Sequence, residues 1–158
     1  RNGQYQQAEQ KLHKLLKKDP DSIWYNSTLA EVMQYQQRLD EALSLYESQL
    51  LLYPDDLAIG TRMIKVLLLQ GENDQALQQA LALKARHSEV PGVHSLLVQI
   101  YHNMDEPVLK QLAEADYQWA NGNREYAQKL YKQLLAEGLL DAAREARLSE
   151  RIQVDVSK

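Results

Sequence analysis

The chain has 158 residues, a formal net charge of −4 and no cysteine. This length suits one domain with a real core. The lack of cysteine excludes a disulfide framework, a thiolate metal site and cysteine catalysis. The mild negative charge argues against a general nucleic-acid binder, which usually has a strong basic excess. No apolar run approaches the roughly 20 residues that a membrane-spanning helix needs.

Apolar residues recur at helical spacing, beginning with the stripe of Ala8, Leu12, Leu15 and Leu16. Leucine and alanine are abundant and favour helix. The pairs 21–22 and 55–56 are Asp-Ser and Asp-Asp, which cap helix starts. The pattern therefore predicts an all-α chain of about nine helices. We expect them near residues 4–17, 22–36, 39–52, 56–70, 73–87, 91–104, 107–121, 123–137 and 139–153.

A 34-residue interval links corresponding positions. Pro20 and Pro54 are one interval apart, and Ala8, Ala42 and Ala76 follow at the same spacing. A small alanine lets two helices pack closely, and a proline ends each unit. This pattern resembles the tetratricopeptide repeat, which implies antiparallel helical hairpins stacked in a solenoid.

The interval slips in the second half of the chain. Gly122 and Ala127 repeat the turn and small-residue positions, but Ala127 comes one and a half intervals after Ala76. Either residues 91–104 form an extra helix outside the repeat, or the count continues with Lys110 in the small-residue position. The poor fit of lysine there favours the extra helix.

We therefore interpret residues 1–158 as a single tetratricopeptide repeat domain cut from a longer protein, because it begins with half a repeat. It ends in a capping helix with Leu140, Ala143, Leu148 and Ile152 facing inward. The predicted parts are a half repeat (1–22), two repeats (23–56 and 57–90), the extra helix (91–106), a repeat (107–138) and the capping helix (139–158).

Residue patterns typical of catalysis are missing from the sequence. No histidine lies in an HExxH pattern, all six glycines are isolated, and no GxSxG is present. His102, Asp105 and Glu106 could collect a cation, but surface polar residues at a turn are the better interpretation. We expect no catalytic residue, no metal site and no cofactor in this segment.

In a helical-hairpin solenoid, the first helix of each hairpin lines a concave groove that binds partner segments. Further aromatic candidates for it are Tyr101, Tyr117 and Trp119, although such residues also pack hairpins together; Tyr5, Tyr46 and Tyr131 are expected in the core. By the 34-residue count, the predicted partner-binding groove contains Trp24, Ser27, Glu31, Gln34, Tyr35, Thr61, Lys65, Leu68 and Leu69, with Ala58 beside them.

A clamp for a C-terminal carboxylate would need paired basic and amide residues on successive helices. Asn26, Arg62 and Lys65 do not form that pairing. The groove, rich in Gln and Tyr, better suits an extended polypeptide.

The order of segments carries a closer resemblance. The chain reads PDSIWY at 20–25, HSLLVQIYHNMDE at 94–106, KQLAEADYQWANGNREYAQKLYKQLL at 110–135 and AAREARLSERIQ at 142–153. This run is similar to the C-terminal repeat domain of periplasmic zinc metallopeptidases, the beta-barrel assembly-enhancing proteases. The resemblance implies a periplasmic location. It also implies docking to the outer-membrane β-barrel assembly machinery and its substrates, and a zinc peptidase domain outside this chain. The alternative is a generic repeat scaffold or assembly adaptor with no protease attached.

Overall fold

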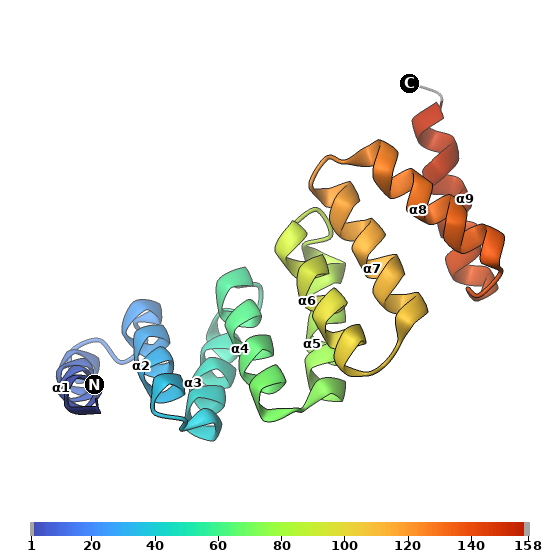
Figure 1. Cartoon of the computed structure of the whole chain (residues 1–158). Helices are drawn as coiled ribbons and strands as arrows, with labels where there is room; N and C mark the ends of the chain where they lie inside the picture. Colours follow the sequence, from blue (N-terminus) through green and yellow to red (C-terminus); the bar gives the residue numbers. More distant parts are fainter. Residues whose placement is uncertain (1, 157–158) are drawn as a thin grey trace. The chain divides into compact units, whose positions relative to one another are not determined.

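The computed structural model of the chain describes residues 2–156, and every regular element in that range is an α-helix. Arg1 and residues 157–158, which fall in the predicted half repeat and capping helix, lie outside the described residues. The expected all-α class is confirmed, and each predicted boundary lies within three residues of the observed one. The helices are α1 (Asn2–Leu16), α2 (Ile23–Tyr35), α3 (Leu39–Leu52), α4 (Leu57–Gln70), α5 (Asn73–Arg86), α6 (Pro91–Asn103), α7 (Pro107–Ala120), α8 (Arg124–Glu137) and α9 (Ala142–Val156), as Figure 1 shows.

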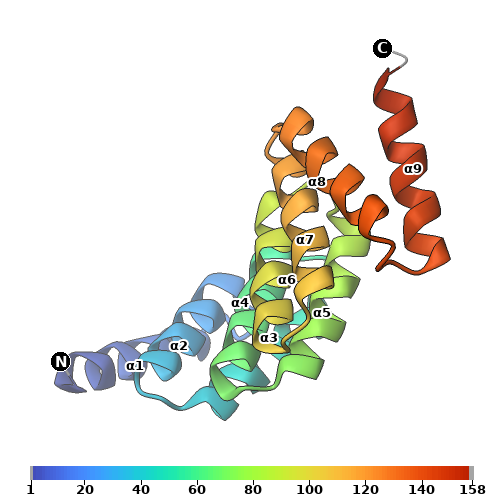
Figure 2. The same cartoon turned by 45° about the vertical axis from the view of Figure 1, so that its right-hand side comes forward.

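The chain divides into two compact units, Arg1–Arg86 and His87–Lys158. In the first unit each of the helices α1 to α4 packs against the next one. In the second unit α6 packs against α7, α7 against α8 and α8 against α9. Consecutive helices within a unit run in opposite directions (Figure 1 and Figure 2). Each unit therefore has the expected architecture of stacked antiparallel hairpins.

Small residues allow the close helix contacts that the repeat pattern requires. Ala42, Ala76 and Ala127 have no exposed surface, and Ala8 is half-buried. Gly60 on α4 serves the same purpose, because a Cβ there would lie only 3.2 Å from Leu83 Cδ1 on α5. Larger side chains at these positions would force the helices apart.

One type of turn recurs at the repeat interval. Gln37, Gly71 and Asp105 have positive φ, and the N–H of the following residue bonds to the carbonyl five residues before it at 2.9 Å. This geometry ends a helix by satisfying its last carbonyl groups. Gly122 ends α7 with the same turn, half an interval later. The turns after α2, α4 and α6 are thus 34 residues apart, whereas the turn after α7 follows the one after α6 by only half that interval.

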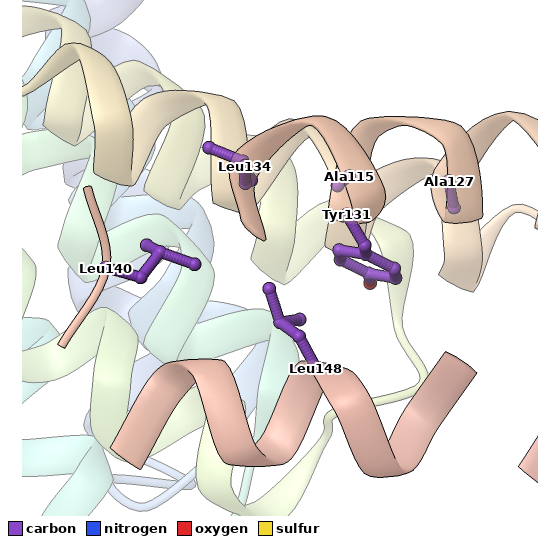
Figure 3. Packing of buried hydrophobic residues seen from close by; sticks show 6 residues of the cluster. All are labelled: Ala115, Ala127, Tyr131, Leu134, Leu140 and Leu148. Atoms are coloured by element: carbon purple, nitrogen blue, oxygen red, sulfur yellow. The ribbon is translucent and has the colours of Figure 1, made fainter. Parts of the chain in front are cut away.

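The core of the second unit contains a cluster of Leu134 and Tyr131 of α8, Leu148 of α9 and Leu140 before it, and Figure 3 shows Tyr131 and Leu148 pointing toward one another. Ile152 packs against this cluster, so the predicted inward side of the capping helix holds at Leu140, Leu148 and Ile152. The prediction is wrong for Ala143, which is exposed. Five residues before Leu148, Ala143 is turned about 140° around the helix from it.

Candidate partner-binding face

The starts of α2 and α4 are fixed by side chains that bond to nearby backbone groups. The Asn26 amide donates to the carbonyl oxygen of Pro20 at 2.8 Å and to that of Ser22 at 3.1 Å. Asp56 Oδ1 accepts the Ile59 N–H at 2.9 Å and caps α4. Both helix starts are therefore held in position relative to the loops before them.

A cleft of about 530 Å³ is lined by residues of these two helix starts and the loops before them, and we call it the α2–α4 cleft. Its size lies within the range of ordinary binding pockets. Its lining residues are Asp19, Asp21, Ser22, Ile23, Trp24, Ser27, Tyr53, Asp56, Ala58, Ile59 and Arg62.

Two aromatic side chains of the cleft are open to solvent. Trp24 is 80% exposed, and Tyr53 is 38% exposed. The indole of Trp24 therefore has most of its apolar surface in water, where it contributes little to folding. Aromatic side chains with few rotatable bonds make strong anchors when a partner covers them.

The charges around the cleft are mostly negative. Asp19, Asp21 and Asp56 contribute three carboxylates, and Arg62 contributes the only basic side chain of the lining. Arg62 Nη2 lies 3.1 Å from Glu31 Oε1, so this guanidinium is already paired across the surface between α4 and α2.

The Glu31–Arg62 ion pair lies close to a buried tyrosine. Burial raises the pKa of Tyr46 to about 12, and the negative charge of Glu31 adds to the increase while Arg62 opposes it. The Gln34 amide donates to the Tyr46 hydroxyl oxygen at 2.8 Å. Gln34 is half-buried, and this hydrogen bond commits its amide to a contact between α2 and α3.

Ser27 lines the cleft from a mostly buried position. It touches the cleft but is only 3% exposed, and its hydroxyl donates to Gln49 Oε1 at 3.1 Å. Gln49 on α3 is 2% exposed. Ser27 is therefore part of the buried layer between α2 and α3, where its hydroxyl is committed to the amide oxygen of Gln49.

The other predicted groove residues on α2 and α4 extend beyond the cleft. Tyr35 is 69% exposed and stacks on Tyr5, with ring centroids 5.4 Å apart. Lys65 is exposed, and Leu69 is 65% exposed. Thr61, Leu68 and Glu31 are half-buried, and Ala58 lines the cleft. We call Trp24, Glu31, Ala58, Arg62, Lys65 and Leu69 the α2–α4 face.

The remaining aromatic residues take part mainly in packing. Tyr46 and Tyr131 have no exposed surface, as expected for core positions, and Tyr5 is half-buried. Tyr101 is 8% exposed. Trp119 is half-buried against Tyr131, with the Arg124 guanidinium 5.4 Å from its ring centroid. Tyr117 is half-buried.

Sequence reasoning missed Tyr53, Asp19 and Asp21, which all line the cleft. The groove was predicted from helix faces alone. Asp19 and Asp21 lie in the loop between α1 and α2, and Tyr53 lies in the loop between α3 and α4. The repeat itself contained a signal, because Asp19 and Tyr53 both directly precede the proline that ends a unit.

The second unit contains a buried polar cluster. His94 is 2% exposed, its Nε2 lies 2.6 Å from the Ser88 carbonyl oxygen, and its Nδ1 lies 3.9 Å from Asp116 Oδ2. The Tyr131 hydroxyl donates to Asp116 Oδ1 at 2.7 Å. The Tyr131 hydrogen bond joins α8 to α7, and the 3.9 Å contact between His94 and Asp116 brings α6 beside α7; His94 Nδ1 itself has no hydrogen-bond partner among the described residues.

Within the described part of the chain, no three His, Asp or Glu side chains gather as a metal ion would require. None of its helices combines the length and apolarity needed to cross a bilayer.

Residues 33–100 match the sequence model of the family described as Tetratricopeptide repeat. No curated protein sequence matches the chain. Twenty-seven chains of solved structures match. One of them is a tetratricopeptide repeat protein from Parabacteroides merdae, with a TM-score of 0.56 and 19% identity over 99% of this chain and 72% of that chain. Residues 33–100 are therefore similar to tetratricopeptide repeats, and the chain shares the all-helical fold of a tetratricopeptide repeat protein.

Proposed function

We propose that this chain is a protein-interaction module that holds an extended polypeptide segment against the α2–α4 face. The observation that carries the proposal is Trp24, an indole 80% exposed beside a cleft of about 530 Å³. A tryptophan whose apolar surface remains in water contributes little to the fold and much to an interface that buries it.

The shape of the face supports a segment rather than a compact ligand. Beyond the cleft, Lys65 and Leu69 continue along α4 as exposed residues. A chain anchored at Trp24 would therefore meet further polar and apolar contacts over several turns of helix. Tetratricopeptide repeats bind protein partners in general, which supports the same conclusion.

We further propose that the natural partners are components of the outer-membrane β-barrel assembly machinery and its substrates, bound in the periplasm. The module would then bring them to a zinc peptidase domain of the same protein. The resemblance in the order of segments between residues 20 and 153 supports this proposal. The competing proposal is a repeat scaffold with no protease attached, which the repeat pattern supports equally well.

Site-specific photo-crosslinking in cells tests both levels of the proposal. A photoreactive amino acid is placed at Trp24, Lys65 or Leu69, with exposed Glu47 on α3 and Gln78 on α5 as controls. We expect protein adducts at the face and none at the controls; the reverse pattern would refute the binding face. Mass spectrometry of the adducts then separates outer-membrane assembly components from other partners, and the latter would leave only the general scaffold.

A further inference from the structure

We propose that the α2–α4 cleft selects a segment with a large apolar side chain flanked by lysine or arginine. This inference rests on the proposed function and names the chemistry of its partner. It follows from the combination of an open aromatic cleft and an unbalanced set of charges around it.

The carboxylates of the cleft outnumber its single basic side chain. Three carboxylates, Asp19, Asp21 and Asp56, face one guanidinium, that of Arg62. Arg62 pairs with Glu31 at 3.1 Å, which cancels its charge locally. The cleft therefore presents about three uncompensated negative charges to a bound segment.

Asp19 and Asp21 are the carboxylates available to a partner. Both are exposed, and neither side chain has a hydrogen-bond or ion-pair partner within residues 2–156. Asp56, in contrast, uses Oδ1 to cap α4. Lysine and arginine side chains form charge-assisted hydrogen bonds with carboxylates of this kind, whereas an acidic segment would be repelled.

The aromatic residues supply the apolar part of the recognition. Trp24 and Tyr53 are both exposed at the cleft. Ile23, which precedes Trp24 in the sequence, is half-buried and also lines the cleft. A partner's aromatic or leucine side chain would remove this surface from water. A cation beside it could also lie over the indole face, an arrangement that tryptophan favours more than the other aromatic residues do.

Selection from a library of random dodecapeptides displayed on phage tests the partner chemistry. The immobilised chain is the target, and phage that also bind the Trp24→Ala variant are removed. We expect the remaining peptides to be enriched in an aromatic residue or leucine next to lysine or arginine. Enrichment in acidic peptides, or no charge preference, would overturn the inference.

The selected basic peptide is then titrated by fluorescence anisotropy. Asp19→Asn with Asp21→Asn should weaken its binding about twofold to thirtyfold, as expected for the loss of two exposed charge pairs. Raising NaCl should weaken it in the same direction. Asp74→Asn with Asp105→Asn is the matched control, because it removes two exposed carboxylates that do not line the cleft. We expect the control to bind like the wild type.

The outcomes separate this inference from the proposed function. If the Asp19/Asp21 pair and the Asp74/Asp105 pair lose the same affinity, the effect is a general one of net charge and the inference fails. If peptides of any charge bind equally but still need Trp24, the binding face stands and only the partner chemistry is wrong. If no peptide is selected, the inference is refuted, and the photo-crosslinks decide the proposed function independently.

Discussion

The buried pair of Ser27 and Gln49 yields a prediction that separates packing from partner binding. Ser27→Ala removes the hydroxyl that donates to Gln49 Oε1 at 3.1 Å. Both residues are at least 97% buried, and Gln49 Nε2 has no partner among the described residues, so the variant would leave the whole amide unpaired. Leaving a buried polar group unpaired costs about 1–3 kcal/mol.

The double variant Ser27→Ala with Gln49→Met should not lose this stability. Methionine has a similar length and no amide to satisfy, so the double variant replaces both polar groups with apolar ones. Such paired replacements are nearly neutral or stabilising. We therefore expect Ser27→Ala to lower the free energy of unfolding by about 1–2 kcal/mol, and the double variant to recover the wild-type value or exceed it.

Urea unfolding followed by circular dichroism measures these differences. In thermal unfolding, the melting temperature should fall by about 2–4 °C for each kcal/mol of lost unfolding free energy in a chain of this size. Peptide affinity should stay unchanged in Ser27→Ala, because the hydroxyl is committed to Gln49. A neutral Ser27→Ala, or a double variant less stable than that single one, would refute the reasoning.

Three further predictions test other parts of the fold by urea unfolding. Tyr131→Phe should cost about 1.5–3 kcal/mol, because its hydroxyl donates to a buried carboxylate. Gly71→Ala should destabilise the chain by about 1–2 kcal/mol, since φ is +79° with no atom near a Cβ, whereas helical Gly92→Ala should be neutral or stabilising. Bonds from the Arg38 guanidinium lower the pKa of Glu9 below its ordinary 4.5. The stability that ionised Glu9 contributes is therefore fully present above pH 4.5, and it is lost as the pH falls through the pKa of Glu9 in the folded state. Arg38→Gln should remove most of this pH dependence, because Arg38 is the largest cause of the lowered pKa of Glu9.

Periodic features of the chain were predictable because they depend on local spacing. The 34-residue interval placed Ala42 and Ala76 in the core, where both have no exposed surface. Apolar spacing placed the helices to within three residues. A pattern that repeats along one helix needs no knowledge of its neighbours.

Features that depend on contacts between helices could not be predicted. Ser27 has the spacing of a groove residue, and only its bond to Gln49, 22 positions away, shows that it is buried. Asp21 enters the cleft from a loop that no helical count covers, and the spacing of the prolines marks the place of Tyr53 in the repeat without indicating that it lines a cleft. The burial of His94 near Asp116 depends on α6 meeting α7, which no sequence pattern indicates.

The fluorescence of Trp24 tests the central claim most directly. In a Trp119→Phe variant, Trp24 is the only tryptophan, and its indole begins 80% exposed. Titration with a dodecapeptide selected on the chain should shift its emission to shorter wavelength, with a midpoint equal to that of the anisotropy titration. Saturable binding with no change in Trp24 emission would place the bound segment elsewhere and contradict the account.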